Sequence, residues 1–228
     1  MKINGIFVIG TGTDVGKTYA AGYLVRELRQ RGVSAGYYKA ALSGALEENG
    51  RLIPGDAAFV CELAGLDAAP QELVSYIYKT AVSPALAAER EGNLPDLAVI
   101  ERDAFALAKK YDYLIVEGSG GIYCPLRRGD TTIELTDVIR RLRLDTVLVA
   151  DAGLGTLNSI VLTLSYAASH DIVVRGLILN RFERENFLHQ DNRESLQALG
   201  APPIVAVIAP DGGFEEVCLD PIFKEPIQ

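Results

Sequence analysis

The sequence predicts a single-domain α/β protein built on a doubly wound, mostly parallel β-sheet. About six short apolar runs alternate along the chain with segments of helical periodicity, the pattern of strands joined by helical crossovers. A glycine-rich loop separates the first apolar run from the first helical segment, and polar residues follow several later runs. The 228 residues contain no internal repeat, low-complexity tract or linker, so one domain over residues 1–228 is favoured.

The expected strands are short and apolar, as strands buried on both faces of a parallel sheet should be. They cover residues 6–9, 33–38, 113–116, 146–150, 174–179 and 204–208. Polar residues and glycines over residues 40–56 indicate an exposed and mobile loop. The tail after Gly213 shows little periodicity of either kind.

The expected helices occupy residues 18–30, 56–64, 84–91, 96–110, 136–143, 156–169 and 184–199. In the first of them apolar side chains recur at helical spacing, and Gly32 supplies a stop signal. Ser83 is the expected cap of the third helix, with Pro84 in its first turn. Asp96 is the expected cap of the fourth helix, and Gly200 ends the last one.

Composition and charge narrow the possible functions. A net charge of −8 and a pI near 4.9 argue against a nucleic-acid-binding surface, which needs a basic field. No apolar run approaches the roughly 20 residues of a membrane span, and the first run leads directly into the glycine-rich loop, as a core strand does. Cys61, Cys124 and Cys218 are widely spaced, which suits a reducing compartment. We therefore expect a cytoplasmic protein that binds neither nucleic acid nor membrane.

The glycine-rich loop, residues 10–18 (GTGTDVGKT), is typical of a phosphate-binding P-loop. It lies between a strand and a helix, where free backbone N–H groups and the helix dipole favour an anion. Lys17 is placed to reach the terminal phosphates of a nucleotide as a point charge. The Thr18 hydroxyl is of the kind that joins a Mg²⁺ coordination sphere. The predicted fold is accordingly similar to that of P-loop nucleoside triphosphatases (NTPases).

The loop departs from the usual spacing in one respect. The standard pattern places a glycine five residues before Gly16, and Thr11 stands there instead. A dinucleotide-binding loop fits less well, because Val15 occupies the position where a small residue must let helix and strand pack closely. A plain turn between strand and helix would leave the Gly-Lys-Thr triplet unexplained.

Other polar groups follow expected strands and should share the ligand-binding edge of the sheet with the loop. Lys39 is one, with a solvated surface lysine as the alternative. Glu117, followed by glycines, is similar to the second acidic motif of P-loop enzymes, or else is a solvated strand-end residue. Asp151 and Asn180 follow two later strands. Asp56 is either a helix cap or a metal carboxylate, and its spacing does not choose between the two.

At this point the chain resembles the dethiobiotin synthetases over nearly its full length. Six motifs match in order: the loop over residues 10–18, Tyr38-Lys39 with Ser43-Gly44, Asp56, Ser83-Pro84, residues 116–121 (VEGSGG) and residues 153–158 (GLGTLN). The unusual spacing of the loop is part of that resemblance. Three departures accompany it: Ala40 replaces the usual proline, Ala85 a histidine, and Ser159 another histidine. The first departure is expected to loosen the loop around Lys39, and the other two affect substrate-side contacts rather than phosphate chemistry.

The resemblance implies an ATP- and Mg²⁺-dependent ligase of biotin biosynthesis. In that family 7,8-diaminononanoate takes up CO₂, or bicarbonate-derived CO₂, as a carbamate on one amine. ATP phosphorylates the carbamate, and the second amine displaces phosphate to close the ureido ring, leaving ADP and phosphate. Such phosphoryl transfer needs positioning and charge neutralisation rather than a covalent enzyme group.

The resemblance also assigns roles by position. Lys17 and Lys39 would be the catalytic residues, and Thr18, Asp56 and Glu117 would hold Mg²⁺. ATP contacts would come from Asp14, Val15, Gly16, Lys17, Thr18, Tyr19, Asp56, Glu117, Gly118, Ser119, Gly120, Asn180, Arg181, Ala209 and Pro210. Substrate contacts would come from Thr13, Ser43, Leu154, Gly155 and Asn158, the last three reaching the site of the partner subunit in a homodimer.

Other classes share this kind of core. ATPase switches similar to ParA and MinD carry an additional lysine four residues before the loop glycine, where this chain has Gly12, and tend to carry a basic or membrane-seeking surface. A ligase similar to cobyrinate amide synthase would need a glutaminase domain, for which we expect 228 residues to leave no room. A related ligase acting on a different diamine stays open, because the three departures permit it.

Overall fold

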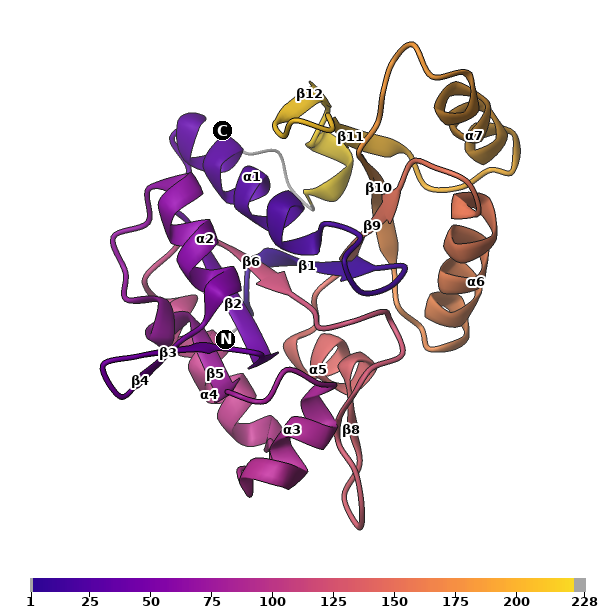
Figure 1. Ribbon diagram of the computed structural model, residues 1–228. Helices are drawn as coiled ribbons and strands as arrows, with labels where there is room; N and C mark the ends of the chain where they lie inside the picture. Colours follow the sequence, from indigo (N-terminus) through magenta and orange to yellow (C-terminus); the bar gives the residue numbers. More distant parts are fainter. Residues whose placement is uncertain (1, 224–228) are drawn as a thin grey trace.

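Eight strands form the central sheet in the order β12–β11–β10–β9–β1–β6–β2–β5 in the computed structural model, which describes residues 2–223 (Figure 1). Every neighbouring pair in this sheet is parallel except β11 with β12. The strands are β1 Gly5–Gly10, β2 Ala35–Ser43, β5 Val74–Tyr78, β6 Tyr113–Glu117, β9 Thr146–Asp151, β10 Val174–Asn180, β11 Ile204–Ile208 and β12 Phe214–Val217. The predicted doubly wound, mostly parallel α/β fold is confirmed.

In the described part of the chain, seven α-helices connect the strands: α1 Lys17–Gln30, α2 Gly55–Ala64, α3 Pro84–Glu91, α4 Leu97–Leu107, α5 Leu135–Leu142, α6 Thr156–Ser169 and α7 Phe187–Ala198. Short 3₁₀ turns cover Pro70–Leu73 and Asp220–Ile222. The Asp96 side chain accepts a hydrogen bond from Ala98 N, as the cap of α4 should. Ser83 occupies the cap position of α3, but its side chain makes no capping bond.

The core explains why the strands read as continuous apolar runs. Strand β1 lies in the middle of the sheet, and residues Ile6 and Ile9 within it are fully buried. A strand covered on both faces has no solvent side, so apolar and polar residues do not alternate along it. The strands β2, β5 and β6, which follow β1 in the chain, lie on one side of it in the sheet. The later strands β9 to β12 lie on its other side. A ligand crevice is expected at the carboxyl end of β1, where these two groups of strands diverge.

The sequence-based boundaries are wrong around Lys39. The expected strand over residues 33–38 is the longer β2, and Lys39 lies inside it rather than at its end. The cause is β5, which was not predicted. It pairs with Lys39, where the pairing of β2 with β6 ends, and continues along Ala41, Leu42 and Ser43. Residues 40–43 are thus a paired strand instead of an exposed loop, so Ala40 does not loosen the chain around Lys39.

Three further strand pairings were also not predicted. An exposed hairpin of β3 Leu46–Glu48 and β4 Arg51–Ile53 follows β2. A second small ladder joins β7 Pro125–Arg127 to β8 Ile133–Glu134. Strand β12 closes the main sheet on the β11 edge, within the tail that showed no periodicity. These five strands have two to four residues each, so two-residue alternation has little length in which to appear.

Within residues 2–223, no helix has both the length and the apolar character needed to cross a bilayer.

Candidate active site

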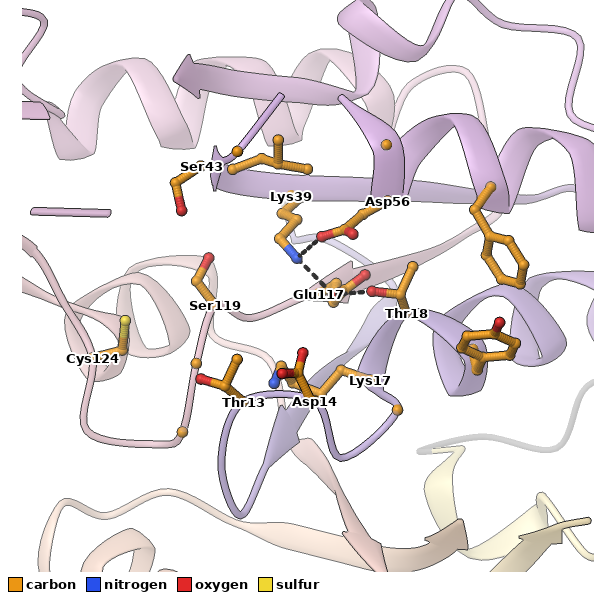
Figure 2. Close-up of a pocket in the computed structure, with 18 of the residues that line it drawn as sticks. Thr13, Asp14, Lys17, Thr18, Lys39, Ser43, Asp56, Glu117, Ser119 and Cys124 are labelled. Atoms are coloured by element: carbon orange, nitrogen blue, oxygen red, sulfur yellow. Dashed lines mark hydrogen bonds and ion pairs between the residues drawn. The ribbon is translucent and has the colours of Figure 1, made fainter. Parts of the chain in front are cut away.

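A cleft of about 1350 Å³ opens at the carboxyl edge of the sheet. Its walls come from the loop between β1 and α1, the ends of β2, β6 and β10, the start of α2 and the segment after β11. The polar groups that the sequence analysis placed near strand ends, among them Lys17, Glu117 and Asn180, lie on these elements. The fold therefore gathers them around one cavity. Figure 2 shows side chains from four elements converging there: Lys17 and Thr18 of α1, Lys39 of β2, Asp56 of α2 and Glu117 of β6.

The glycine-rich loop turns sharply before α1. Asp14 and Gly16 both adopt left-handed backbone conformations, with φ of 59° and 95°. A Cβ atom at Gly16 would also lie 2.1 Å from Asn180 Nδ2, so only glycine fits this position. Lys17 turns back over the loop, and its ammonium donates to Gly12 O at 2.7 Å. The loop therefore surrounds a cation placed among its own backbone groups, as a phosphate cradle requires.

Lys17 is buried, and burial lowers the pKa of its ammonium, with Glu117 acting in the opposite direction and Lys39 adding to the decrease. A desolvated ammonium that donates to a neutral carbonyl has much to gain from an anion. The lowered pKa thus indicates where negative charge would be bound most favourably in the cleft.

The end of β10 fixes the loop from the other side of the cleft. Asn180 Nδ2 donates to Val15 O at 3.0 Å, and Arg181 Nη2 donates to Asp14 O at 2.9 Å. Arg181 is itself anchored by Asp151 Oδ2 at 2.5 Å. The amide oxygen of Asn180 takes no part in the bond to Val15, which leaves an acceptor for a ligand in the cleft.

Lys39 is the electrostatic centre of the site (Figure 2). Its Nζ lies 2.6 Å from Glu117 Oε1 and 2.5 Å from Asp56 Oδ2. Lys39 and Glu117 are register partners on neighbouring strands, and both are nearly fully buried. Burial lowers the pKa of Lys39, but Glu117 and Asp56 outweigh burial and leave that pKa above the ordinary value. Lys39 is therefore a fixed cation and not a surface lysine.

Asp56 is not the cap of α2. The helix begins at Gly55 with Pro54 before it, so Asp56 falls in the first turn and its carboxylate points to Lys39. Glu117 closes the group: its Oε1 also accepts from Thr18 Oγ1 at 2.9 Å, and its Oε2 accepts from the Tyr37 hydroxyl at 2.6 Å. Burial, and next the neighbouring Glu117, raise the pKa of the Tyr37 phenol well above its usual range.

The group of Thr18, Asp56 and Glu117 has the chemistry of a Mg²⁺ site. It offers two carboxylates and a hydroxyl, the hard oxygen donors that Mg²⁺ prefers, in a cleft open enough to leave room for water and phosphate oxygens. The Lys39 ammonium already lies between the two carboxylates, so the protein has arranged them around positive charge. Within residues 2–223, no group of three or more histidine, cysteine or acidic side chains is arranged so that it could hold a metal ion by itself.

The cleft gathers most of the residues that the sequence singled out. Its lining includes Thr13, Asp14, Gly16, Lys17, Thr18, Tyr19, Lys39, Ser43, Asp56, Glu117, Ser119, Gly120, Asn180, Arg181, Ala209 and Pro210. Val15 does not line it and contributes only its carbonyl to Asn180. Gly118 does not line it either, because it packs against Phe7 and Leu135, where a Cβ would lie 3.1 Å and 2.9 Å from their side-chain atoms.

Leu154, Gly155 and Asn158 lie outside this cleft, on the exposed approach to α6 and its first turn. Leu154 is 91% exposed. Of the three departures from the family pattern, Ala40 and Ala85 are buried, and the Ser159 hydroxyl donates within α6 to Thr156 O.

Sequence reasoning missed Tyr37 and the cleft-lining Phe59, Tyr123 and Cys124. The rings of Tyr19 and Phe59 pack in a tilted arrangement with centroids 4.6 Å apart. A signal for Tyr37 was present, because residues two apart on a strand share one face and Lys39 was already a candidate. The other three have no comparable signal, since apolar and aromatic residues are far more often core than site.

Comparisons with known proteins agree with this geometry. Residues 4–215 match the model of a family described as AAA domain. The ATP-dependent dethiobiotin synthetase BioD of Clostridium novyi (strain NT) is 46% identical over 90% of this chain and 87% of that protein. That of Brachyspira hyodysenteriae (strain ATCC 49526 / WA1) is also 46% identical, over 89% and 90%. This chain belongs to the dethiobiotin synthetase family.

Solved structures support the fold alone. The signal recognition particle receptor FtsY from Elizabethkingia anophelis in complex with GDP superposes with a TM-score of 0.57 at 14% identity, covering 99% of this chain and 65% of that one. A ParA family ATPase from Chlorobium tepidum TLS superposes with a TM-score of 0.54 at 18% identity, covering 92% and 86%. The same fold thus occurs in proteins of different function.

Proposed function

We propose that this protein is an ATP- and Mg²⁺-dependent dethiobiotin synthetase, which carboxylates 7,8-diaminononanoate with CO₂ and closes the ureido ring. The observation that carries the proposal is the placement of Lys39 between Glu117 and Asp56, opposite the P-loop lysine. The cleft therefore offers two cations to two anionic groups at once, a nucleotide phosphate and a substrate carboxylate or carbamate.

The chemistry divides into three balanced steps. One amine of the diamine attacks CO₂ and loses a proton, forming the carbamate. A carbamate oxygen attacks the γ-phosphorus, and the bond to ADP breaks. The second amine attacks the carbonyl carbon, loses its proton, and inorganic phosphate leaves as the cyclic urea forms. Each step builds or moves negative charge, so fixed cations in the cleft favour the transition states.

The chain's own residues supply binding and orientation. Backbone N–H groups of the loop and Lys17 would hold the phosphates of ATP. Lys39, fixed by two carboxylates, would hold the carbamate oxygens near the γ-phosphate. Thr13 and Ser43 line the same cleft and would contact the diamine or its carbamate. Because phosphoryl transfer has a loose transition state, this alignment rather than a nucleophilic side chain supplies the catalysis.

Thr18, Asp56 and Glu117 would hold Mg²⁺, which when bound neutralises charge on the phosphates. For that to occur Lys39 must share the carboxylates with the metal or shift toward the substrate. The acceptor left on Asn180, with Ala209 and Pro210, would face the adenine of ATP.

The protein would work as a homodimer. Leu154 is 91% exposed in the loop before α6, and Val161 and Leu162 on that helix are also exposed, at 43% and 61%. An apolar surface of this kind is expected to be covered by a second copy. Residues 154–158 would then reach the partner's cleft, where the amino end of α6 favours the carboxylate of the substrate.

Phosphate release tests the proposal directly. Purified protein with ATP and Mg²⁺ should release phosphate only when both 7,8-diaminononanoate and bicarbonate are supplied. Release at full rate without the diamine would favour an ATPase switch. Release that requires a different diamine would place the protein with a related ligase of the same mechanism.

A further inference from the structure

A fully buried tyrosine lies behind the carboxylate at the centre of the site. Tyr37 is on β2, two residues before Lys39, so both side chains extend from the same face of the strand. Its ring is 0% exposed and does not line the cleft. Its hydroxyl donates to Glu117 Oε2 at 2.6 Å. Tyr37 therefore reaches the site through Glu117 and has no surface of its own for a ligand.

The two oxygens of Glu117 have different surroundings. Oε1 accepts from Lys39 Nζ and Thr18 Oγ1, the groups that border the cleft. Oε2 accepts from the Tyr37 hydroxyl. A carboxylate held at both oxygens cannot rotate about its terminal bond without breaking one of these bonds. The phenol thus fixes the orientation of the carboxylate, with one oxygen held away from the cleft and the other facing it.

We propose that Tyr37 is a positioning residue, which holds Glu117 by Oε2 so that Oε1 is presented to the cation bound by the nucleotide. This inference rests on one part of the proposed function, the role of Glu117 as a Mg²⁺ ligand. Hydrogen-bond partners of a metal ligand set its orientation and basicity, and their removal costs about 10- to 100-fold in metal affinity.

The test is a titration of Tyr37→Phe with Mn²⁺ in the presence of a non-hydrolysable ATP analogue. Electron paramagnetic resonance measures the bound Mn²⁺ at each step. We expect metal affinity to fall by about 10-fold or more. Affinity for the same analogue without metal should stay unchanged, because the phenol touches neither the loop nor Lys17. Unchanged metal affinity in a folded variant would overturn the proposal.

Tyr78→Phe is the matched control. Tyr78 is likewise 0% exposed, and its hydroxyl donates to Asn93 O at 2.7 Å, away from the two carboxylates. We expect this variant to bind Mn²⁺ as the parent protein does. An equal loss of metal affinity in both variants would mean that a buried tyrosine hydroxyl supports the fold in general, and would contradict the role assigned to Tyr37.

A double-variant cycle tests whether the effect passes through Glu117. In a Glu117→Gln background, Tyr37→Phe should have little further effect on Mn²⁺ affinity, whereas independent effects would add and refute the proposal. If Tyr37→Phe alone does not fold, the double variant should regain folding, since it no longer buries a carboxylate oxygen that has lost its phenol donor. Failure of the double variant to recover would count against the proposal. These titrations contain no diamine, so their outcome is separate from that of the phosphate-release assay.

Discussion

Replacing Lys39 with glutamine removes the cation from between two carboxylates. Glu117 is 1% exposed, so its charge would be left buried, while Asp56 at 38% side-chain exposure is screened by water and counts for less. Breaking a buried ion pair by removing one partner costs about 3–5 kcal/mol. With a urea m-value of about 3 kcal/mol/M, the unfolding midpoint should fall by about 1–1.7 M.

Mg²⁺ should return part of that stability, because a divalent cation offers the two carboxylates the charge that Lys39 supplied. Urea unfolding of Lys39→Gln with and without Mg²⁺ measures both effects. Turnover should be lost while ATP still binds through the P-loop, which a fluorescent nucleotide titration measures. Lys79→Gln is the matched control, since Lys79 pairs with Glu47 on the surface at 65% side-chain exposure and its loss should leave the midpoint unchanged.

The difference in stability between the parent protein and Lys39→Gln should depend on pH with a definite sign. The pKa of Lys39 is raised in the folded protein, so its stabilising contribution is complete below the ordinary lysine value of about 10.4 and is lost as the pH rises through the raised pKa. The gap between parent and Lys39→Gln should therefore be full at neutral pH and close only in strong alkali. A midpoint shift no larger than that of Lys79→Gln, with turnover retained, would refute the assignment of Lys39.

Three other predictions concern the same cleft. Glu117→Gln should raise the Mg²⁺ concentration needed for half-maximal phosphate release, and an unaltered requirement would remove Glu117 from the metal site. Gly16→Ala should weaken ATP binding at least about tenfold, because a Cβ meets Asn180 and φ is 95°; binding at the parent level would contradict the loop geometry. Burial lowers the pKa of Lys17, so ATP affinity without metal should begin to fall with rising pH below about 10.4, whereas Lys17→Arg should keep its charge there. A parent affinity that stays flat up to that pH would show that the Lys17 charge does not hold the phosphates.

The site could be predicted from sequence to the extent that it depends on strand ends in a parallel sheet. Lys17, Glu117 and Asn180 follow apolar runs, and such runs end at a common edge whatever the loops between them do. The role of Asp56 could not be decided from the sequence, because a helix cap and a metal carboxylate have the same local pattern. The contact that decides is with Lys39, seventeen residues away in the chain.

The errors in the predicted strand boundaries have a related cause. Strand β5 has only five residues, and its pairing with the second half of β2 is a tertiary event with no local mark. Without β5, the segment after Lys39 reads as a loop because it contains small residues and glycine. Tyr37 was overlooked for the opposite reason: it reads as an ordinary core residue, and only its hydroxyl contact with Glu117 distinguishes it.

Incorporation of labelled carbon is the most direct measurement of the central claim. Protein, ATP, Mg²⁺ and 7,8-diaminononanoate are incubated with ¹³C-bicarbonate, and the products are read by mass spectrometry. We expect one labelled carbon in a cyclic urea with the mass of dethiobiotin, formed in step with one phosphate per ring. Phosphate released with no labelled cyclic product would contradict the account.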